Sequence, residues 1–405
     1  MQSPKGRGTS PAPDVERPAP EPSLEVESRE PFLLVPLLRE AVDRRASDLH
    51  LVVDNPPVFR VDGDLVVSEA DPLGPERVKD LIGSVLTSAQ QEELDRQWQL
   101  CISLFIPELG HFRITVYLHR GAMEASIRVC PLSLRTPKEL GLPDVVYTLV
   151  EKRSGLILIT GPTGAGKTTT FNCLLDLINR ERRCKIVTVE DPVEFVHQNR
   201  QSIIVQQQVH SDTRSFSAAL HHILRQDPDV IGVGEMRDLE TISTALTAAE
   251  TGHLVIATLH TPDAVGTVDR IIDAFPSDKQ AQIMVQLAGS IQGIIAQQLL
   301  PRTDGEGRAL ATEVMVATTA IRNQIRERQT NQLRNTIATG RAHGMHLMDR
   351  SLKELYQHGL ITLAAAVAHA YLPESIDGEP TIPAASPLPG AAIGTVTLRH
   401  APPRV

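Results

Sequence analysis

The 405-residue sequence has few aromatic residues and few cysteines. Phe, Trp and Tyr make up only 3% of the chain, so Leu, Ile, Val and Ala must fill its cores, and base stacking on aromatic side chains is excluded as a main mode of action. The four cysteines, Cys101, Cys130, Cys173 and Cys184, are far apart and form no Cys-x-x-Cys pair. This spacing excludes a zinc knuckle or dithiol centre and favours reduced thiols in the cytosol.

The chain also lacks an excess of positive charge and a long apolar run. It has 40 Lys and Arg against 49 Asp and Glu, a formal charge of −9, so no overall basic field attracts a nucleic acid, and we expect no such partner. The N-terminal residues MQSPKGRGTSPAPD contain no apolar segment of a signal peptide. No stretch approaches the ~18 continuous apolar residues of a membrane span. These absences predict a cytoplasmic protein.

Proline is concentrated at the two ends of the chain. Six of the 29 prolines fall in residues 1–30 and seven in 373–405, and both stretches have little apolar periodicity, so we expect two disordered tails. Between the tails the sequence divides at a proline-containing segment, 132–143, which we interpret as a linker. The predicted domains are therefore 31–131 and 144–372.

The first domain has an α-then-β pattern. Apolar residues at helical spacing follow Pro31, and a second helical stretch covers about 74–97. Alternating apolar segments with short connections predict an antiparallel sheet with strands at 49–53, 57–61, 64–67, 100–106, 111–118 and 124–130. We expect a small α+β domain.

The second domain alternates strands, loops and helices. Near-continuous apolar strands are predicted at 155–160, 184–190, 229–234 and 253–259, with helices from Lys167, at 213–226 and at 238–250. Such strands indicate a parallel sheet covered by helices on both faces. Residues 277–371 have a mainly helical pattern. The predicted class is α/β, with a helical C-terminal region.

A glycine-rich loop lies between the first of these strands and its helix. Residues 161–168 read GPTGAGKT and fit GxxxxGK[ST] in the strand–loop–helix context that a phosphate-binding loop requires. The glycines let backbone N–H groups surround a phosphate, Lys167 reaches the β and γ oxygens, and the Thr168 hydroxyl can ligate Mg²⁺. The residues predicted to bind ATP are Gly161, Pro162, Thr163, Gly164, Ala165, Gly166, Lys167, Thr168 and Thr169.

Acidic residues follow two of the other parallel strands. Glu190 ends the strand 184–190, and Glu235 follows the strand 229–234. A nucleotide site needs a carboxylate to position water and others to hold the metal, so we assign Glu235 as the catalytic base and Glu190 as a support for metal or water. The alternative is that acids after strands cap helices, which fits Asp238 well.

His260 follows the strand 253–259. It is either a satisfied polar group at a strand end or a sensor of the γ-phosphate that passes nucleotide state to the next helix. The sequence leaves both interpretations open.

Four segments together resemble a known family. GPTGAGKTTT, VTVEDPVEFVH, LRQDPDVIGVGEMRDLET and AAETGHLVIATLHT are similar to the Walker A, Asp box, Walker B and His box of the type II/IV secretion ATPase superfamily. The C-terminal segment AIRNQIRE, residues 320–327, resembles the AIRNLIRE motif of its type IV pilus retraction branch. The resemblance covers about 31–372.

The resemblance implies a PAS-like domain followed by a RecA-like ATPase domain, assembled as a ring of six around shared nucleotide sites. It implies family roles for Lys167, Thr168, Glu190, Glu235 and His260, and places Arg113 and Arg128 near the nucleotide from the N-terminal sheet. For these arginines the alternative is the solvated face of a strand. The resemblance further implies docking on an inner-membrane pilus platform protein, with no membrane contact of the chain's own.

The sequence departs from the family most clearly at residues 205–210. Residues 205–210 read VQQQVH where the family usually has NQREVG, so that Gln207 and Gln208 replace an Arg-Glu pair and turnover is expected to be slow. Residues 320–341 hold five arginines and one acid, a basic stretch that is either a solvated helix face or a contact with the pilus machine.

The expected function is a motor that couples ATP hydrolysis to pilus retraction. A pilus-assembly or type II secretion ATPase is one alternative. Such ATPases usually carry a tetracysteine zinc insert and a long folded N-terminal extension, and the sequence shows neither. A weakly active ring that regulates a paralogous motor is another, supported by Gln207 and Gln208. A nucleic-acid translocase disagrees with the acidic balance.

Overall fold

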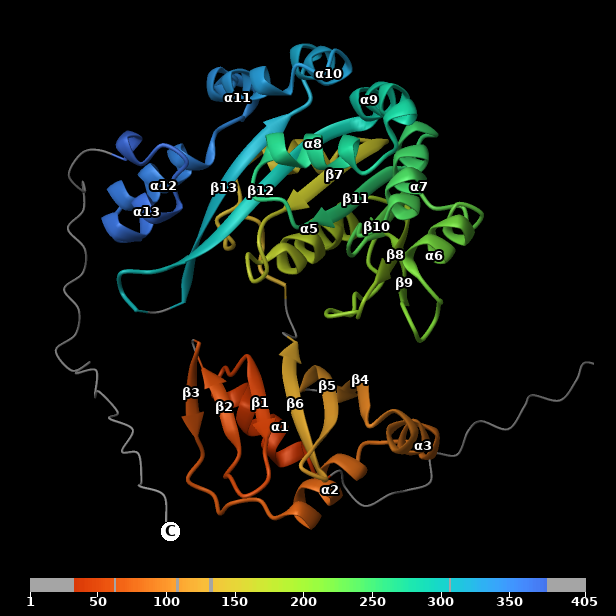
Figure 1. Cartoon of the computed structure of the whole chain (residues 1–405), viewed down its shortest axis with the longest axis vertical. Helices are drawn as coiled ribbons and strands as arrows, with labels where there is room; N and C mark the ends of the chain where they lie inside the picture. The colour runs from red at the N-terminus through yellow and green to blue at the C-terminus, as the bar shows by residue number, and fades with distance from the viewer. Residues whose placement is uncertain (1–32, 62, 107–108, 131–133, 306, 377–405) are drawn as a thin grey trace, which may run out of the picture.

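The computed structural model describes residues 33–61, 63–106, 109–130, 134–305 and 307–376 (Figure 1). The predicted tail 1–30 and most of the predicted tail 373–405 lie outside these residues. At the C-terminal end, Pro373–Ser375 form a short 3-10 helix, η2, and Ile376 is buried. Residues 373–376 therefore have described structure beyond the predicted boundary at residue 372.

The N-terminal part contains one antiparallel sheet. Its strands are β1 (Asp48–Leu51), β2 (Val58–Val61), β3 (Asp64–Val67), β4 (Gln99–Ile106), β5 (Gly110–His119) and β6 (Ala122–Cys130), in the spatial order β3-β2-β1-β6-β5-β4. All six predicted strands of the α+β domain are confirmed.

This sheet has one apolar and one polar face because side chains alternate along each strand. Leu49, Ile114 and Ile127 are fully buried against the helices α1 (Val35–Asp43) and α2 (Pro75–Gly83). Their neighbours along the strands, such as Asp48 and Arg128, lie on the opposite face. The second face is therefore available to meet another part of the protein.

The helical stretch predicted at 74–97 is two helices, α2 and α3 (Ser88–Gln97). Thr87 begins α3 with a capping box, in which its side chain accepts from the N–H of Gln90 and the Gln90 side chain accepts from the N–H of Thr87. This reciprocal pair satisfies two end groups of α3 and starts a new helix.

The C-terminal part is built on a seven-stranded sheet. Its strands are β7 (Gly155–Thr160), β8 (Lys185–Glu190), β9 (Ile203–Gln208), β10 (Val230–Val233), β11 (Leu254–Leu259), β12 (Ile291–Pro301) and β13 (Arg308–Val316), in the order β13-β12-β7-β11-β10-β8-β9. All neighbours are parallel except β12 and β13.

Helices cover both faces of this sheet (Figure 1). One apolar cluster joins the strands to α4 (Val145–Val150) and α5 (Lys167–Glu181). A second, on the other face, joins them to α6 (Phe216–Ile223), α7 (Leu239–Glu250), α8 (Ala264–Asp273) and α9 (Ser277–Ser290). The predicted α/β class is confirmed.

The mainly helical pattern predicted for 277–371 missed the hairpin β12–β13. Most of β12 is buried on both faces, so it lacks the alternation that identifies a half-exposed strand. The polar strand β9 was also missed. The helical region begins after β13 and comprises α10 (Thr319–Arg326), α11 (Thr330–Thr339), η1 (Arg341–His343), α12 (Met348–Gln357) and α13 (Leu363–His369).

Candidate active site

The loop between β7 and α5 has the backbone of a phosphate-binding loop. Its three glycines, Gly161, Gly164 and Gly166, have φ values of 142°, 80° and 85°, a region that residues with a side chain rarely adopt. Lys167, Thr168 and Thr169 form the first turn of α5. The loop and the N-terminus of the helix together present N–H groups and partial positive charge to an anion.

Lys167 is held inside this loop. Its Nζ donates to the carbonyl oxygens of Gly161 at 2.8 Å and Pro162 at 3.0 Å, and lies 3.3 Å from His260 Nδ1. Burial lowers the pKa of Lys167, while the charge of Glu235 opposes the shift. The ammonium group of Lys167 is therefore held by the backbone of the phosphate-binding loop.

Glu235 and His260 meet beside Lys167. They follow β10 and β11, and because β7, β11 and β10 are adjacent parallel strands, their carboxyl ends lie along one edge of the sheet. His260 Nε2 is 3.0 Å from Glu235 Oε1, and Arg237 is 2.7 Å from Glu235 Oε2. Burial alone raises the pKa of Glu235, but Arg237, His260 and Lys167 outweigh it and hold that pKa below its ordinary value. Glu235 is therefore an ionised carboxylate.

Glu190 lies in a different environment. It is 2% exposed at the end of β8 and accepts hydrogen bonds from Thr188 at 2.7 Å and Gln206 at 3.0 Å. Burial raises its pKa to about 7, although these two hydrogen bonds oppose the shift. Among the described residues it makes no hydrogen bond to Thr168, with which it was predicted to hold the metal.

A buried polar network connects Glu190 with the loop helix. Asn172 on α5 donates to the carbonyl oxygen of Thr168, and its own oxygen lies 2.8 Å from His197 Nε2. The Gln206 side chain accepts a hydrogen bond from the backbone N–H of His197 at 2.8 Å and donates one to Glu190. Burial lowers the pKa of His197 to about 4, so its ring is neutral. The sequence analysis assigned no role to Asn172, His197 or Gln206.

The described residues contain no cluster of three or more His, Cys, Asp or Glu side chains suited to holding a metal ion. Mg²⁺ at nucleotide sites is usually held by one or two protein groups together with phosphate oxygens and water. Thr168 lies in the first turn of α5, and its role as a ligand of Mg²⁺ stays a prediction.

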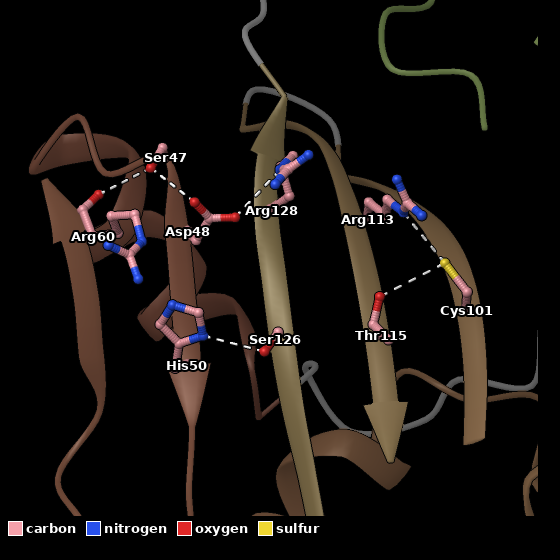
Figure 2. Close-up of polar contacts among 9 residues, drawn as sticks. All are labelled: Ser47, Asp48, His50, Arg60, Cys101, Arg113, Thr115, Ser126 and Arg128. Atoms are coloured by element: carbon pink, nitrogen blue, oxygen red, sulfur yellow. Dashed lines mark hydrogen bonds and ion pairs between the residues drawn. The ribbon is translucent and has the colours of Figure 1, made fainter. Parts of the chain in front are cut away.

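Arg113 and Arg128 are cross-strand partners on the polar face of the N-terminal sheet, and Figure 2 shows their surroundings. Arg128 forms an ion pair with Asp48 at 3.3 Å, and Arg113 donates to Cys101 Sγ at 3.4 Å. In the described chain neither arginine contacts Lys167, Glu235 or His260. Their predicted approach to the nucleotide stays a prediction.

A cavity of about 670 Å³ lies between the two sheets and is lined by Arg113 from one and by Asp191 and Gln208 from the other. Ser103 of β4 donates to Gln208 Oε1 at 3.4 Å across this boundary. Gln208 Oε1 also accepts from the Val193 N–H. Gln208, one of the two glutamines that replace the family's Arg-Glu pair, thus contacts the N-terminal sheet.

The basic stretch 320–341 is less available than its sequence suggests. Arg322 donates to two carbonyl oxygens at the end of α9, Arg328 pairs with Asp273, and Arg334 lies near Asp349 and over the Tyr371 ring. Arg326 and Arg341 are exposed, and so is Arg328, whose ion pair joins two exposed side chains. Only Arg322 and Arg334 are therefore partly buried by contacts within the chain.

The glycine loop, its lysine, and the glutamate and histidine at neighbouring strand ends define a P-loop nucleoside triphosphatase. The chain matches the family model described as Type II/IV secretion system protein over residues 127–371, and it belongs to this family. No helix of the described residues is long and apolar enough to span a membrane.

Individual relatives agree with the family. The chain is 42% identical to the Type IV pilus retractation ATPase PilT of Pseudomonas aeruginosa, over 84% of this chain and 98% of that protein. It is 34% identical to the Type IV pilus ATPase PilU of the same organism, over 82% and 87%. A crystal structure of the pilus retraction motor PilT with bound ADP matches with a TM-score of 0.79 and 43% identity, over 85% of this chain and 98% of that one. The resemblance to retraction ATPases is confirmed.

Proposed function

We propose that the protein is the ATP-hydrolysing motor that retracts a type IV pilus. The observation that carries the proposal is the continuous contact from Lys167 through His260 to Glu235 at the ends of three adjacent parallel strands. This arrangement places a phosphate-binding cation and an ionised carboxylate on the two sides of one imidazole. The relatives named for pilus retraction support the direction of work.

In the proposed reaction, the loop N–H groups and Lys167 bind the β- and γ-phosphates of ATP. Glu235 accepts a hydrogen bond from a water molecule and orients the water oxygen toward the γ-phosphorus. A bond forms between the water oxygen and this phosphorus while the bond from the phosphorus to the ADP oxygen breaks, and the proton that the water loses passes to Glu235 and leaves with the released phosphate. Its lowered pKa suits a carboxylate that orients water throughout the physiological pH range. Thr168, with Glu190 in support, would hold Mg²⁺, which would neutralise phosphate charge.

His260 is the residue through which the γ-phosphate acts on the rest of the protein. It touches both Lys167 and Glu235, and the helix that follows it, α8, begins four residues later at Ala264. A phosphate that draws Lys167 away from the imidazole changes the contacts of His260. The change reaches α8 because only a short connection separates them.

The larger cycle requires the two parts of the chain to move against one another. Arg113 lines the cavity between the sheets, so closure of the N-terminal sheet onto the ATPase part brings this arginine, and Arg128 beside it, toward the phosphates. The segment 132–143 is the proposed hinge. We further propose a ring of six copies, on the cytoplasmic face of the inner membrane, acting on a pilus platform protein.

A regulatory ring with little turnover is the second candidate, because Gln207 Oε1 is buried without a hydrogen-bond partner in the described structure. An Arg-Glu pair at positions 207 and 208 would carry charges that this chain does not have. Measuring ATP hydrolysis by the purified protein separates a regulatory ring from a motor.

The test of the proposed function is a count of surface pili and a measurement of twitching in cells whose sole copy carries Lys167→Ala. A retraction motor gives excess pili and no twitching. Bare cells indicate an assembly ATPase, and unchanged cells indicate an accessory role. Lys279→Ala is the matched control, since Lys279 is exposed on α9, and it should behave as wild type.

A further inference from the structure

The hairpin that sequence periodicity missed lies directly against the phosphate-binding loop. β12 runs parallel to β7, with Ala296 paired to Thr160, the last residue before the loop. The next residue on β12, Gln297, is therefore level with Gly161. A Cβ atom on Gly161 would lie 2.3 Å from the Gln297 carbonyl oxygen, closer than atoms can approach. The loop begins in contact with this glutamine.

The Gln297 side chain continues beneath the second half of the loop. Its Nε2 donates to the carbonyl oxygen of Ala165 at 2.7 Å, and a Cβ on Gly166 would lie 3.3 Å from the same nitrogen. Gln297 is 0% exposed. One residue thus contacts the loop at Gly161, Ala165 and Gly166.

Only the donor half of this carboxamide is used. Gln297 Oε1 is buried and has no hydrogen-bond partner among the described residues, and an unpaired buried acceptor is unfavourable. An apolar side chain of similar size would avoid that cost. The presence of glutamine is therefore explained by what its N–H group does for the Ala165 carbonyl.

The orientation of the Ala165 carbonyl determines the orientation of the N–H that follows it. Each peptide unit carries its C=O and the following N–H on opposite sides, so a carbonyl held outward by Gln297 turns the N–H of Gly166 toward the phosphate side. We propose that Gln297 is a positioning residue of the phosphate-binding loop, which fixes the Ala165–Gly166 peptide in the orientation that binds phosphate. This inference rests on the proposed nucleotide site, though not on the direction of work.

A glutamate at position 297 tests the donor specifically. Ionised, it cannot donate to Ala165, whereas protonated it can, and burial raises the pKa of such a carboxyl toward neutrality or above. We therefore compare ADP binding by calorimetry at pH 6 to pH 9 for the full-length wild type, Gln297→Glu and Gln297→Leu. Thermal unfolding of each protein is recorded at each pH.

Gln292→Glu is the matched control. Gln292 lies on the same strand, and its Nε2 likewise donates to a backbone carbonyl, that of Ser154 at 2.9 Å. Ser154 precedes β7, whereas the loop follows it, so the lost hydrogen bond is at the far end of that strand. Any general effect of a carboxylate on β12 should appear in both variants.

The expected result is that Gln297→Glu binds ADP about tenfold more weakly than wild type at pH 9, as for the loss of one hydrogen bond, and recovers toward wild type at pH 6. Gln297→Leu should be weak at every pH, and Gln292→Glu should match wild type. The inference is overturned if Gln297→Glu stays within twofold of wild type at pH 9, if its loss does not depend on pH, or if Gln292→Glu shows the same profile.

ADP binding together with the pilus count described above separates this inference from the proposed function. Wild-type protein that fails to bind ADP refutes the nucleotide site and the role of Gln297 together. Wild-type protein that binds ADP but does not retract pili leaves the role of Gln297 intact.

Discussion

His260 donates a hydrogen bond to Glu235 in the only tautomer that suits both of its neighbours. Lys167 Nζ, 3.3 Å from His260 Nδ1, is an ammonium and can only donate, so Nδ1 must be the acceptor. The ring therefore carries a proton on Nε2, which lies 3.0 Å from Glu235 Oε1. Donation runs in one direction, from the loop lysine to the carboxylate, and replacing any of the three residues breaks it.

The first prediction concerns Glu235→Gln. The amide keeps the size of the side chain but is a poorer acceptor for the attacking water, so we expect ATP hydrolysis to fall about 100- to 10,000-fold, the usual contribution of such a group. Nucleotide binding should be retained, because Lys167 and the loop are unchanged. Hydrolysis at the wild-type rate in the purified variant would refute the assignment. Glu240→Gln, at an exposed position on α7, is the control.

A second prediction follows from the pKa of Glu190, which burial raises to about 7 from an ordinary value of 4.5. Between these two pH values the folded state binds more protons than the unfolded state, so this group lowers the free energy of unfolding as pH rises. Glu190→Gln has no such proton to lose. Its free energy of unfolding relative to that of wild type should therefore increase as the pH rises from 4.5 to about 7. The gain should then level off.

Denaturant titrations at several pH values measure this difference. Each unit of pKa is worth ~1.4 kcal/mol, so the gain is at most on the order of 3 kcal/mol. Glu76→Gln, exposed on α2, is the control. A difference between Glu190→Gln and wild type that does not change with pH would contradict the prediction.

The features that the sequence predicts correctly are those with a local signal. The glycine spacing of the loop is enough to predict its backbone conformation. Glu235 and His260 follow short apolar strands, whose carboxyl ends lie at one edge of the sheet because the strands are parallel. The α+β character of the first domain follows from alternation within each strand. In each case a few neighbouring residues determine the structure.

The hairpin β12–β13 has no such signal, because β12 is buried on both faces by residues distant in sequence. The turn Thr303-Asp304-Gly305 after β12 was the available indication of a hairpin. Gln297, which reaches Ala165 across 132 positions of sequence, and the network from Asn172 to Glu190 depend on this long-range packing. The partners of Arg322 and Arg334 were unpredictable for the same reason.

A third prediction concerns His210, whose φ of 69° lies in the left-handed region. This conformation costs an L-residue roughly 1–2 kcal/mol, and the retraction family usually has glycine here. His210→Gly should raise the free energy of unfolding by about 0.5–1 kcal/mol, since the greater freedom of glycine in the unfolded chain offsets part of the relief. His210→Ala, which removes the ring but keeps a Cβ, should give no gain. Equal stabilisation by both variants would show that the backbone is not the cause.

The last prediction separates the two possible roles of the arginines on α10. Arg322 Nη1 donates to the carbonyl oxygens of Ala288 and Gly289, both at 2.7 Å, and so satisfies the C-terminal end of α9. Arg322→Ala should lower the free energy of unfolding by about 1–3 kcal/mol, the range for hydrogen bonds to a charged group. Arg326→Ala should change it by less than about 0.5 kcal/mol, because Arg326 is exposed and its hydrogen bond to Asn323 lies within one helix.

Twitching by cells that carry each variant then distinguishes structure from partner contact. If Arg326→Ala abolishes twitching at wild-type stability and ATPase rate, the exposed face of α10 contacts the pilus machine. If only Arg322→Ala is defective, and its loss of twitching parallels its loss of stability, the arginines of this segment support the fold of the ATPase part. The two arginines are one helical turn apart on the same helix, and each variant removes one positive charge. A difference between the variants is therefore due to the contacts of each arginine and not to the charge of the basic stretch.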